Sequence, residues 1–267
     1  MSFDVVSWWF FLCAVAVINI AAWLLSAFTE AIAARRLQLV LSGGYVFGCA
    51  FRSFFPVYDI QRLCLVDSWL SSVLAGRSVA TVAELCFAAQ WALLLHENAR
   101  ATGSEAARRV AFTIVPLIAL AEVFSWYAVL TTWNLGHVVE NSLWGISGAL
   151  VLVGMRAIAP RLSASRTPML AAWGFAGVVY VTFMFLVDVP MYWSRWLADQ
   201  ASERGYLSLA QGVLDASACK LVSFRWEDWK SEVTWMSLYF SVGVWASISL
   251  IHAPAPVARI DAAVRST

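Results

Sequence analysis

The sequence predicts an all-α fold, a polytopic membrane helical bundle with seven transmembrane helices plus one interfacial helix. Composition is the first observation: of 267 residues, 61% are hydrophobic and 13% are charged. Soluble domains contain about 45–50% apolar and about 25% charged residues. The mean hydropathy of +0.72 is typical of a membrane protein and argues against a soluble globular enzyme. A net charge of +1 gives no electrostatic reason to expect nucleic acid as a partner.

Long apolar segments are the second observation. A helix needs about 20 mostly apolar residues to cross a bilayer. Seven stretches qualify, with these bounds: 7–28, 37–56, 78–96, 110–132, 138–158, 169–190 and 233–252. The stretch 59–76, DIQRLCLVDSWLSSVLAG, is too short and too charged to span, so we expect an interfacial helix there, with a re-entrant segment as the alternative. No inverted repeat or long linker divides the chain, which predicts a single transmembrane domain over residues 1–267.

Basic residues orient this bundle. The N-terminal MSFDVVSWWFF has no basic region and no cleavage site, so we expect a retained span. The N-terminus and the 133–137 turn contain no Lys or Arg, whereas the connections after spans one, three and five and the C-terminal tail contain Arg35, Arg36, Arg100, Arg108, Arg109, Arg156, Arg161, Arg166, Arg259 and Arg265. The positive-inside rule then predicts a multi-pass inner (plasma) membrane protein with its N-terminus outside, its C-terminus in the cytoplasm and an extracytoplasmic loop over 193–232.

Charged residues inside the spans all fall at a similar depth. They are Arg52, Glu84, Glu122, Glu140 and Asp188, and each lies in the outer half or at the outer boundary of the predicted bilayer. A charged residue at the centre of a membrane helix costs about 2.5–3.5 kcal/mol on insertion scales, so such residues usually pair or carry function. Their common depth predicts that they meet.

Polar stripes on three spans support this convergence. In TTWNLGHVVENSLW (131–144), the residues His137, Glu140, Asn141 and Trp144 follow i, i+3, i+4, i+7 spacing and share one helix face. Glu122 and Trp126 share a face of span four, and Glu84 and Trp91 share a face of span three. Lipid cannot satisfy polar side chains, so these faces are expected to line protein or a water-filled cavity.

Three functions compete for such a cluster. A structural network would use Arg52 and Arg62 to pair the acids within a non-catalytic subunit of a membrane complex. A proton-coupled small-molecule transporter would use the carboxylates as a relay, although the inner half of the spans has almost no ionisable residues. An intramembrane enzyme would use them for acid–base chemistry on a lipidic or isoprenoid-like substrate, because one clustered carboxyl can be protonated while another is ionised.

The enzyme hypothesis assigns a role to each candidate residue. The catalytic candidates are Glu84, Glu122, Glu140, Asn141 and His137, with His137 relaying protons to the outer face. The candidates for substrate binding are Arg52, Arg62, Trp91, Trp126, Trp144 and Asp188. The expected partner is a membrane lipid or another hydrophobic small molecule, and both a homo-oligomer and a partner subunit stay open.

No cofactor or metal is expected. Five cysteines form no CxxC and three histidines form no HExxH. His137 and Glu140 are three residues apart, but di-metal bundles use two Glu-x-x-His pairs, and this chain has one pair in reversed order. Cys64 and Cys219 are the cysteines outside the predicted spans on the oxidising side, which predicts a disulfide between them.

The segment NSLWGISGALVLV (141–153), with an acid in each of the two preceding spans, resembles the emopamil-binding sterol isomerase family. The resemblance covers these few residues and does not extend along the chain. It implies proton chemistry on a lipid.

The orientation is the first testable prediction. Because the arginines concentrate on one side, a single cysteine placed next to Arg161 should react with a membrane-impermeant maleimide only after the cytoplasmic side is opened. A cysteine in the 133–137 turn serves as the control and should react from outside. Reaction of the first site in intact cells would invert the predicted topology.

Overall fold

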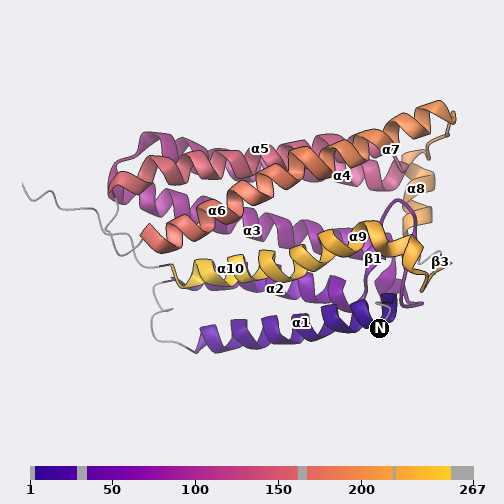
Figure 1. Cartoon of the computed structure of the whole chain (residues 1–267), viewed down its shortest axis with the longest axis horizontal. Coiled ribbons are helices and arrows are strands. Elements are labelled where there is room, and N and C mark those ends of the chain that lie inside the picture. Colours follow the sequence, from indigo (N-terminus) through magenta and orange to yellow (C-terminus); the bar gives the residue numbers. More distant parts are fainter. Residues whose placement is uncertain (1–3, 29–34, 162–166, 219–220, 254–267) are drawn as a thin grey trace, which may run out of the picture.

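The computed structural model describes residues 4–28, 35–161, 167–218 and 221–253, and most of these residues are helical (Figure 1). Six of the described helices are long and apolar enough to cross a membrane. They are Val5–Ala27, Val73–Thr102, Glu105–Thr131, Asn134–Ile158, Pro168–Ala201 and Trp226–Ile251. The chain is therefore an all-α, multi-pass membrane-type protein, as its composition predicts.

Short polar residues begin several of these helices. Asp4 caps α1 (Val5–Ala27), Ser72 caps α3 (Val73–Thr102) and Ser104 caps α4 (Glu105–Thr131), each by accepting a backbone N–H of the first turn. Such caps satisfy N–H groups that have no partner inside the helix. The remaining members of the main bundle are α2 (Arg36–Phe54), α5 (Asn134–Ile158) followed by the 3₁₀ turn η3 (Ala159–Arg161), α6 (Thr167–Phe183) and α10 (Val244–Ile251).

The predicted count of seven spans is not confirmed. The segment predicted as span two, 37–56, corresponds to α2, which lies alongside the other helices but is not among the six long apolar ones (Figure 1). Gln38, Arg52 and three glycines dilute its hydropathy. Its packing against α1, α3 and α10, and not its hydropathy, therefore makes α2 a member of the bundle.

The predicted interfacial helix over 59–76 is wrong. These residues contribute to a β-hairpin, in which β1 (Val57–Tyr58) pairs antiparallel with β2 (Leu63–Cys64), then to a 3₁₀ turn, η2 (Trp69–Ser71), and to the first turn of α3. Arg62 has a left-handed φ of 57°, which turns the chain and interrupts any helix there. A third strand, β3 (Leu221–Val222), pairs parallel with β2.

The predicted loop over 193–232 is largely helical, because helix continues into it from both sides, and its extracytoplasmic position stays a prediction. After α6 the chain runs through a π-helical turn, η5 (Met184–Asp188), into α7 (Val189–Ala201). Pro190 falls in the first turn of α7, where a missing N–H is tolerated. The chain returns through a short α8 (Leu209–Ala216) to α9 (Trp226–Leu238), a second π-helical turn, η6 (Tyr239–Gly243), and α10.

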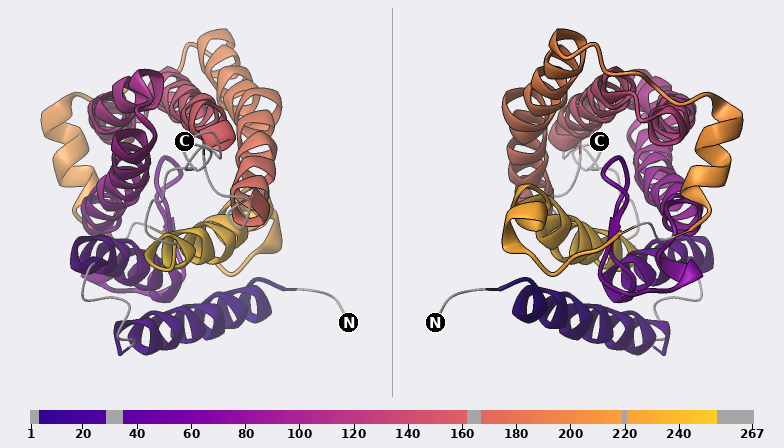
Figure 2. Two further views of the ribbon diagram at one scale, coloured as in Figure 1. Left: turned by 90° about the vertical axis from the view of Figure 1, so that its left-hand side faces the viewer. Right: turned by 90° about the vertical axis from the view of Figure 1, so that its right-hand side faces the viewer.

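Viewed along the bundle, the helices form a ring (Figure 2). The order around it is α2, α3, α4, α5, α6–α7 and α9–α10, which returns to α2, while α1 packs outside against α2 and α10. An apolar cluster that includes Leu95, Ile114, Ile118 and Leu250 fills the end of the ring next to the α3–α4 connection, which we call the inner end after the topology that the sequence predicts. The β1–β2 hairpin lies across the opposite, outer end (Figure 2).

The predicted disulfide between Cys64 and Cys219 is confirmed for Cys64 alone. Cys64 forms a disulfide, while Cys13, Cys49 and Cys86 are free thiols. Cys219, the expected partner, lies outside the described residues. The parallel pairing of Cys64 with Val222 brings the two regions of the chain together at the outer end.

Close packing of α2 on α3 generates the next prediction. A Cβ added at Gly48 would lie 2.6 Å from the Cβ of Ala83, so Gly48→Ala should destabilise the fold by about 1–3 kcal/mol through overpacking. A Cβ at Gly174 on α6 meets nothing within 4 Å, so Gly174→Ala should stabilise the helix by about 0.5–1 kcal/mol. Thermal unfolding in detergent measures both changes. Equal effects of the two substitutions would contradict the tight α2–α3 contact.

Candidate functional site

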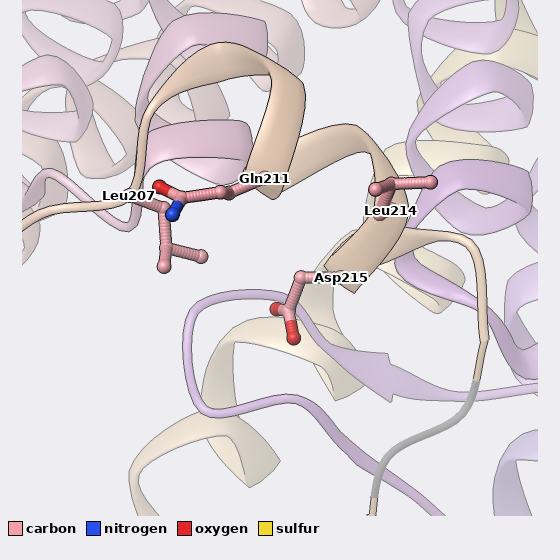
Figure 3. Close-up of a pocket in the computed structure, with 4 residues that line it drawn as sticks. All are labelled: Leu207, Gln211, Leu214 and Asp215. Carbon is pink, nitrogen blue, oxygen red and sulfur yellow. The ribbon is translucent and has the colours of Figure 1, made fainter.

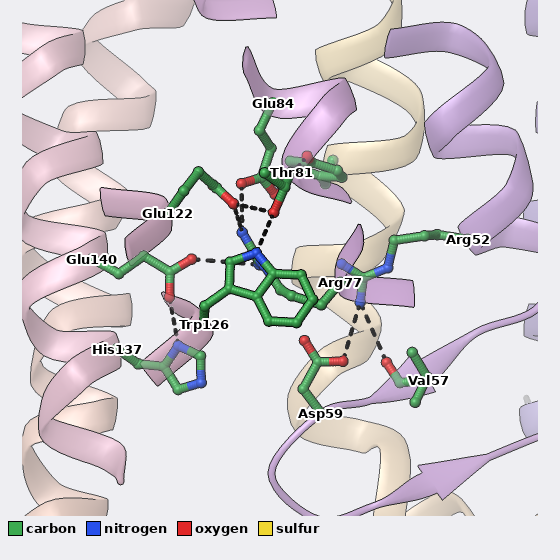
Figure 4. A network of polar contacts seen from close by, with 11 residues as sticks. Arg52, Val57, Asp59, Arg77, Thr81, Glu84, Glu122, Trp126, His137 and Glu140 are labelled. Atoms are coloured by element: carbon green, nitrogen blue, oxygen red, sulfur yellow. Dashed lines mark hydrogen bonds and ion pairs between the residues drawn. The ribbon is translucent and has the colours of Figure 1, made fainter. Parts of the chain in front are cut away.

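Three buried carboxylates meet inside the ring, and this confirms the predicted cluster (Figure 4). Glu84 of α3, Glu122 of α4 and Glu140 of α5 are each at most 6% exposed. One carboxylate oxygen from each lies within 4.8 Å of the others. Three helices therefore bring their acids to one point, as the common depth in the sequence predicts.

Arg77 lies at the centre of these acids. Its Nη2 donates to Glu84 Oε2 at 2.9 Å and to Glu122 Oε2 at 2.6 Å, and its Nη1 lies 3.5 Å from Glu140 Oε1 (Figure 4). Arg77 is only 4% exposed, so water screens these pairs little. A planar guanidinium can contact several carboxylates at once, which a lysine ammonium does less well.

Thr81 and Trp126 hold the Glu122 side of the cluster. Thr81 Oγ1 donates to Glu122 Oε2 at 2.5 Å and accepts from Trp126 Nε1 at 3.0 Å. Arg77, Thr81 and Glu84 are spaced i, i+4, i+7, so one face of α3 presents all three. The other Glu122 oxygen, Oε1, is buried and has no hydrogen-bond partner among the described residues.

His137 connects the cluster to the outer part of the bundle. Its Nδ1 is 2.6 Å from Glu140 Oε2, and its ring packs on Tyr192 of α7 with centroids 4.8 Å apart. Arg195, one turn further along α7, lies over the Tyr192 ring at 5.0 Å and over Tyr58 of β1 at 5.7 Å. Burial raises the pKa of the Tyr58 hydroxyl above its ordinary value.

Both π-helical turns supply a polar side chain near this site. Tyr239 in η6 donates to Glu84 Oε1 at 2.9 Å. Asp188 in η5 is 6% exposed and close enough to Glu140 and His137 to interact with them electrostatically. Single π turns inside helices are frequent at functional sites because the extra residue redirects one side chain.

Charge compensation is incomplete in the cluster. Three carboxylates surround one guanidinium, which leaves an excess of two negative charges if all are ionised, or one if His137 is protonated. An uncompensated charge in a buried site costs several kcal/mol. The cluster therefore holds at least one proton or another cation.

The same three carboxylates are the residues that can hold a metal. Their oxygen donors suit a hard cation such as Mg²⁺. Arg77, however, already bonds Oε2 of both Glu84 and Glu122, and a divalent ion beside that guanidinium would be repelled. The donor set fits shared protons better than a metal.

The two arginines expected near the acids do not pair with the glutamates. Arg52 lies next to the cluster but pairs with Asp59 at 3.6 Å and contacts Val57 O at 3.5 Å (Figure 4). Arg62 holds the hairpin in place: it donates to Asp215 of α8 at 2.6 Å and to Val129 O of α4 at 2.9 Å. The pairing of the acids by Arg52 and Arg62 is therefore wrong, because Arg77 takes that position.

The other candidate residues lie at varying positions around the site. Trp91 stacks edge-on with Phe87 and Trp173, and Trp144 packs on the apolar cluster of the inner end. Asn141 is half-buried within α5, and its side chain makes no hydrogen bond to the described residues. Trp126 is therefore the one tryptophan of the three candidates that bonds a residue of the network.

Figure 3 shows a surface pocket beside α8. Leu207, Gln211, Leu214 and Asp215 line it. Asp215 is the partner of Arg62, so its charge already serves the attachment of the hairpin. This pocket offers no group for the chemistry of the carboxylates.

Sequence reasoning missed Arg77 and Tyr239. Arg77 falls just before the predicted start of span three at residue 78, although its spacing from Thr81 and Glu84 was visible in the sequence. Tyr239 has no such signal, because a π turn changes the helical phase just where this residue lies. Comparison of the chain with protein-family models, with curated proteins and with solved structures gives no significant match.

Removal of the central arginine tests the network. Arg77→Gln leaves three buried carboxylates without their shared partner and should lower stability by about 3–5 kcal/mol. The loss should shrink at acidic pH, where the carboxyls are protonated, and in the double variant with Glu122→Gln. Arg108→Gln removes a pair whose side chains are 54% and 52% exposed, so it should cost at most about 1 kcal/mol. Similar unfolding temperatures for Arg77→Gln and Arg108→Gln would contradict a central role.

Proposed function

We propose that this protein is an intramembrane enzyme that performs acid–base chemistry on a lipidic substrate. The observation that carries the proposal is the excess of carboxylates over cations in a buried site, together with an unpartnered oxygen, Glu122 Oε1. A site that must hold a proton, and that has one carboxylate oxygen free of protein partners, can give that proton to a bound molecule.

The roles of the residues follow from their contacts. Glu122 transfers the proton through Oε1, while Arg77 and Thr81 hold its other oxygen. Glu84 or Glu140 takes a proton from a neighbouring carbon of the substrate, so the cluster ends with as many protons as it began with. His137, bonded to Glu140, exchanges protons with the outer end of the bundle.

A lipidic substrate suits the surroundings of the site. The ring that encloses it is built from apolar membrane-type helices. Aromatic side chains surround the carboxylates: Tyr239 bonds Glu84, Trp235 packs on Tyr239, and Trp126 bonds Thr81. An apolar molecule gains about 25 cal/mol for each Å² that it buries, whereas a polar one would lose its hydration.

Proton-coupled transport is the second candidate. Gln38, Ser42, Gln90 and Ser247 form a fully buried polar network between α2, α3 and α10, and could extend a path from the carboxylates. These groups bond one another, however: Ser247 donates to Gln90 Oε1 at 2.5 Å and Gln90 donates to Gln38 O at 3.3 Å. A satisfied network of this kind acts as a contact between helices in membrane proteins.

Isotope incorporation tests the proposed chemistry. Purified protein in vesicles made from the total lipid of the expressing cells should introduce deuterium from D₂O into the carbon skeleton of one lipid class, detected by mass spectrometry. Glu122→Gln should abolish the incorporation because an amide cannot transfer the proton. Glu105→Gln, on the same helix but 52% exposed, is the matched control and should retain it. Incorporation by neither protein, with proton uptake into sealed vesicles instead, would favour transport.

A further inference from the structure

The carboxylate cluster is closed at both ends of the ring. At the inner end, buried apolar residues including Leu95, Ile114 and Ile118 fill the space between the helices. At the outer end lies the β1–β2 hairpin, whose Leu63 and Cys64 are 6% and 0% exposed. Arg62 fastens this hairpin to α4 and α8. A substrate therefore reaches the site most directly between two helices.

Small residues close most of the contacts between neighbouring helices. Added Cβ atoms would lie 2.6 Å from Cys86 Sγ at Gly44 and 2.7 Å from Ala128 Cβ at Gly136, which shows how closely α2 approaches α3 and α4 approaches α5. Gly177 of α6 packs likewise on Leu152 of α5, and Gly243 of η6 packs on Tyr45 of α2. Backbones that approach so closely leave no room for a lipid chain.

The contact between α6–α7 and α9–α10 is different. Among the described residues no glycine packs across it, and the two backbones come within 8 Å of each other at isolated points at most. Long side chains bridge it at three levels: Arg195 to Glu232 at 3.5 Å, Phe183 on Trp235 at 6.4 Å between centroids, and Trp173 Nε1 to Ser249 Oγ at 2.9 Å. We call this contact the aromatic seam.

The middle bridge of the aromatic seam leads to the carboxylates. Trp235 contacts Tyr239 with ring centroids 5.0 Å apart, and Tyr239 donates to Glu84. Phe183 directly precedes the π turn η5, which contains Asp188. Phe183, Trp235 and Tyr239 therefore form a chain of contacting aromatic side chains that ends at Glu84. Such side chains can change rotamer without moving a helix.

We propose that the aromatic seam is the lateral entrance to the site, and that a lipid acyl or isoprenoid chain enters there from the bilayer by displacing Phe183 from Trp235. The occupant is lipid because the flanking helix Pro168–Ala201 is long and apolar enough to cross a membrane and only 6% of its most apolar stretch is buried, so that in a bilayer this stretch would contact lipid. The inference rests on the proposed function in placing the substrate at Glu84, but it concerns access and not chemistry.

Photolabelling of the protein with the aromatic seam cross-linked, and again without the cross-link, tests this entrance. Phe183→Cys and Trp235→Cys are combined in a protein whose free thiols Cys13, Cys49 and Cys86 are replaced by alanine. The protein is reconstituted in vesicles of dioleoylphosphatidylcholine with a trace of phosphatidylcholine that carries a diazirine in its acyl chain. Half of the sample is linked with a short, reducible bifunctional thiol reagent before illumination, and labelled peptides are identified by mass spectrometry.

The unlinked sample should carry label on the peptides that contain Glu84 and Tyr239, and linking should remove that label. Ser42→Cys with Ser247→Cys, whose Oγ atoms are 3.0 Å apart across the α2–α10 contact, is the matched control, and linking it should leave the label unchanged. Label at Glu84 that survives linking of the seam, or its absence from the unlinked protein, would overturn the entrance.

These experiments distinguish a failure of the proposed acid–base function from a failure of the proposed entrance. Glu122→Gln should accept the photolabel at Glu84 as the parent protein does, since it changes no bridge of the aromatic seam. Normal labelling without deuterium incorporation into lipid would keep the entrance and reject the acid–base chemistry. Deuterium incorporation that persists when the seam is linked would keep the chemistry and reject the entrance.

Discussion

The ion pairs between one guanidinium and three buried carboxylates determine how the helices of this molecule are placed. Each acid costs free energy to bury, and without Arg77 the three would repel one another across less than 5 Å. Because Arg77 contacts residues on α3, α4 and α5 at once, it fixes how these helices are placed against each other. His137 and Tyr239 each bond one further carboxylate oxygen, and Thr81 adds a second bond to the Glu122 oxygen that Arg77 already contacts.

This constraint explains why the bundle is a ring and not a solid cluster of helices. A polar centre needs walls that supply hydrogen bonds inward and apolar surface outward. The helices that supply the carboxylates pack closely through small residues, whereas α6–α7 and α9–α10, which carry the π turns, meet only through long side chains. The closely packed part of the ring thus supplies the three carboxylates.

The sequence predicts the membrane class, most helix positions and the meeting of Glu84, Glu122 and Glu140, because apolar length and helical periodicity are local properties. Prediction from the sequence fails where a residue or strand pairs with a partner far away in the chain. The hairpin of β1 and β2 gains its third strand from residues 221–222, so the stretch 59–76 looked like a surface helix when considered alone. The sequence alone predicts Arg77 in a connection because a charged residue ordinarily ends a span, yet its partners on α4 and α5 make burial possible. The position of Tyr239 cannot be predicted from helical periodicity, because a π turn changes the periodicity of the helix at this residue.

The position of these partners along the chain has a consequence for biosynthesis. Arg77 and Glu84 lie two turns apart on one helix, so α3 can enter the bilayer as a unit whose charges already compensate each other. Glu122 and Glu140 join as the next two helices are made. Tyr239 and β3, which complete the hydrogen bonds of Glu84 and the cover of the ring, are synthesised more than 150 residues after β2. A nascent chain therefore exposes its carboxylates toward the open side of an unfinished ring until its last helix is in place. A chaperone of membrane insertion would bind the chain at that stage.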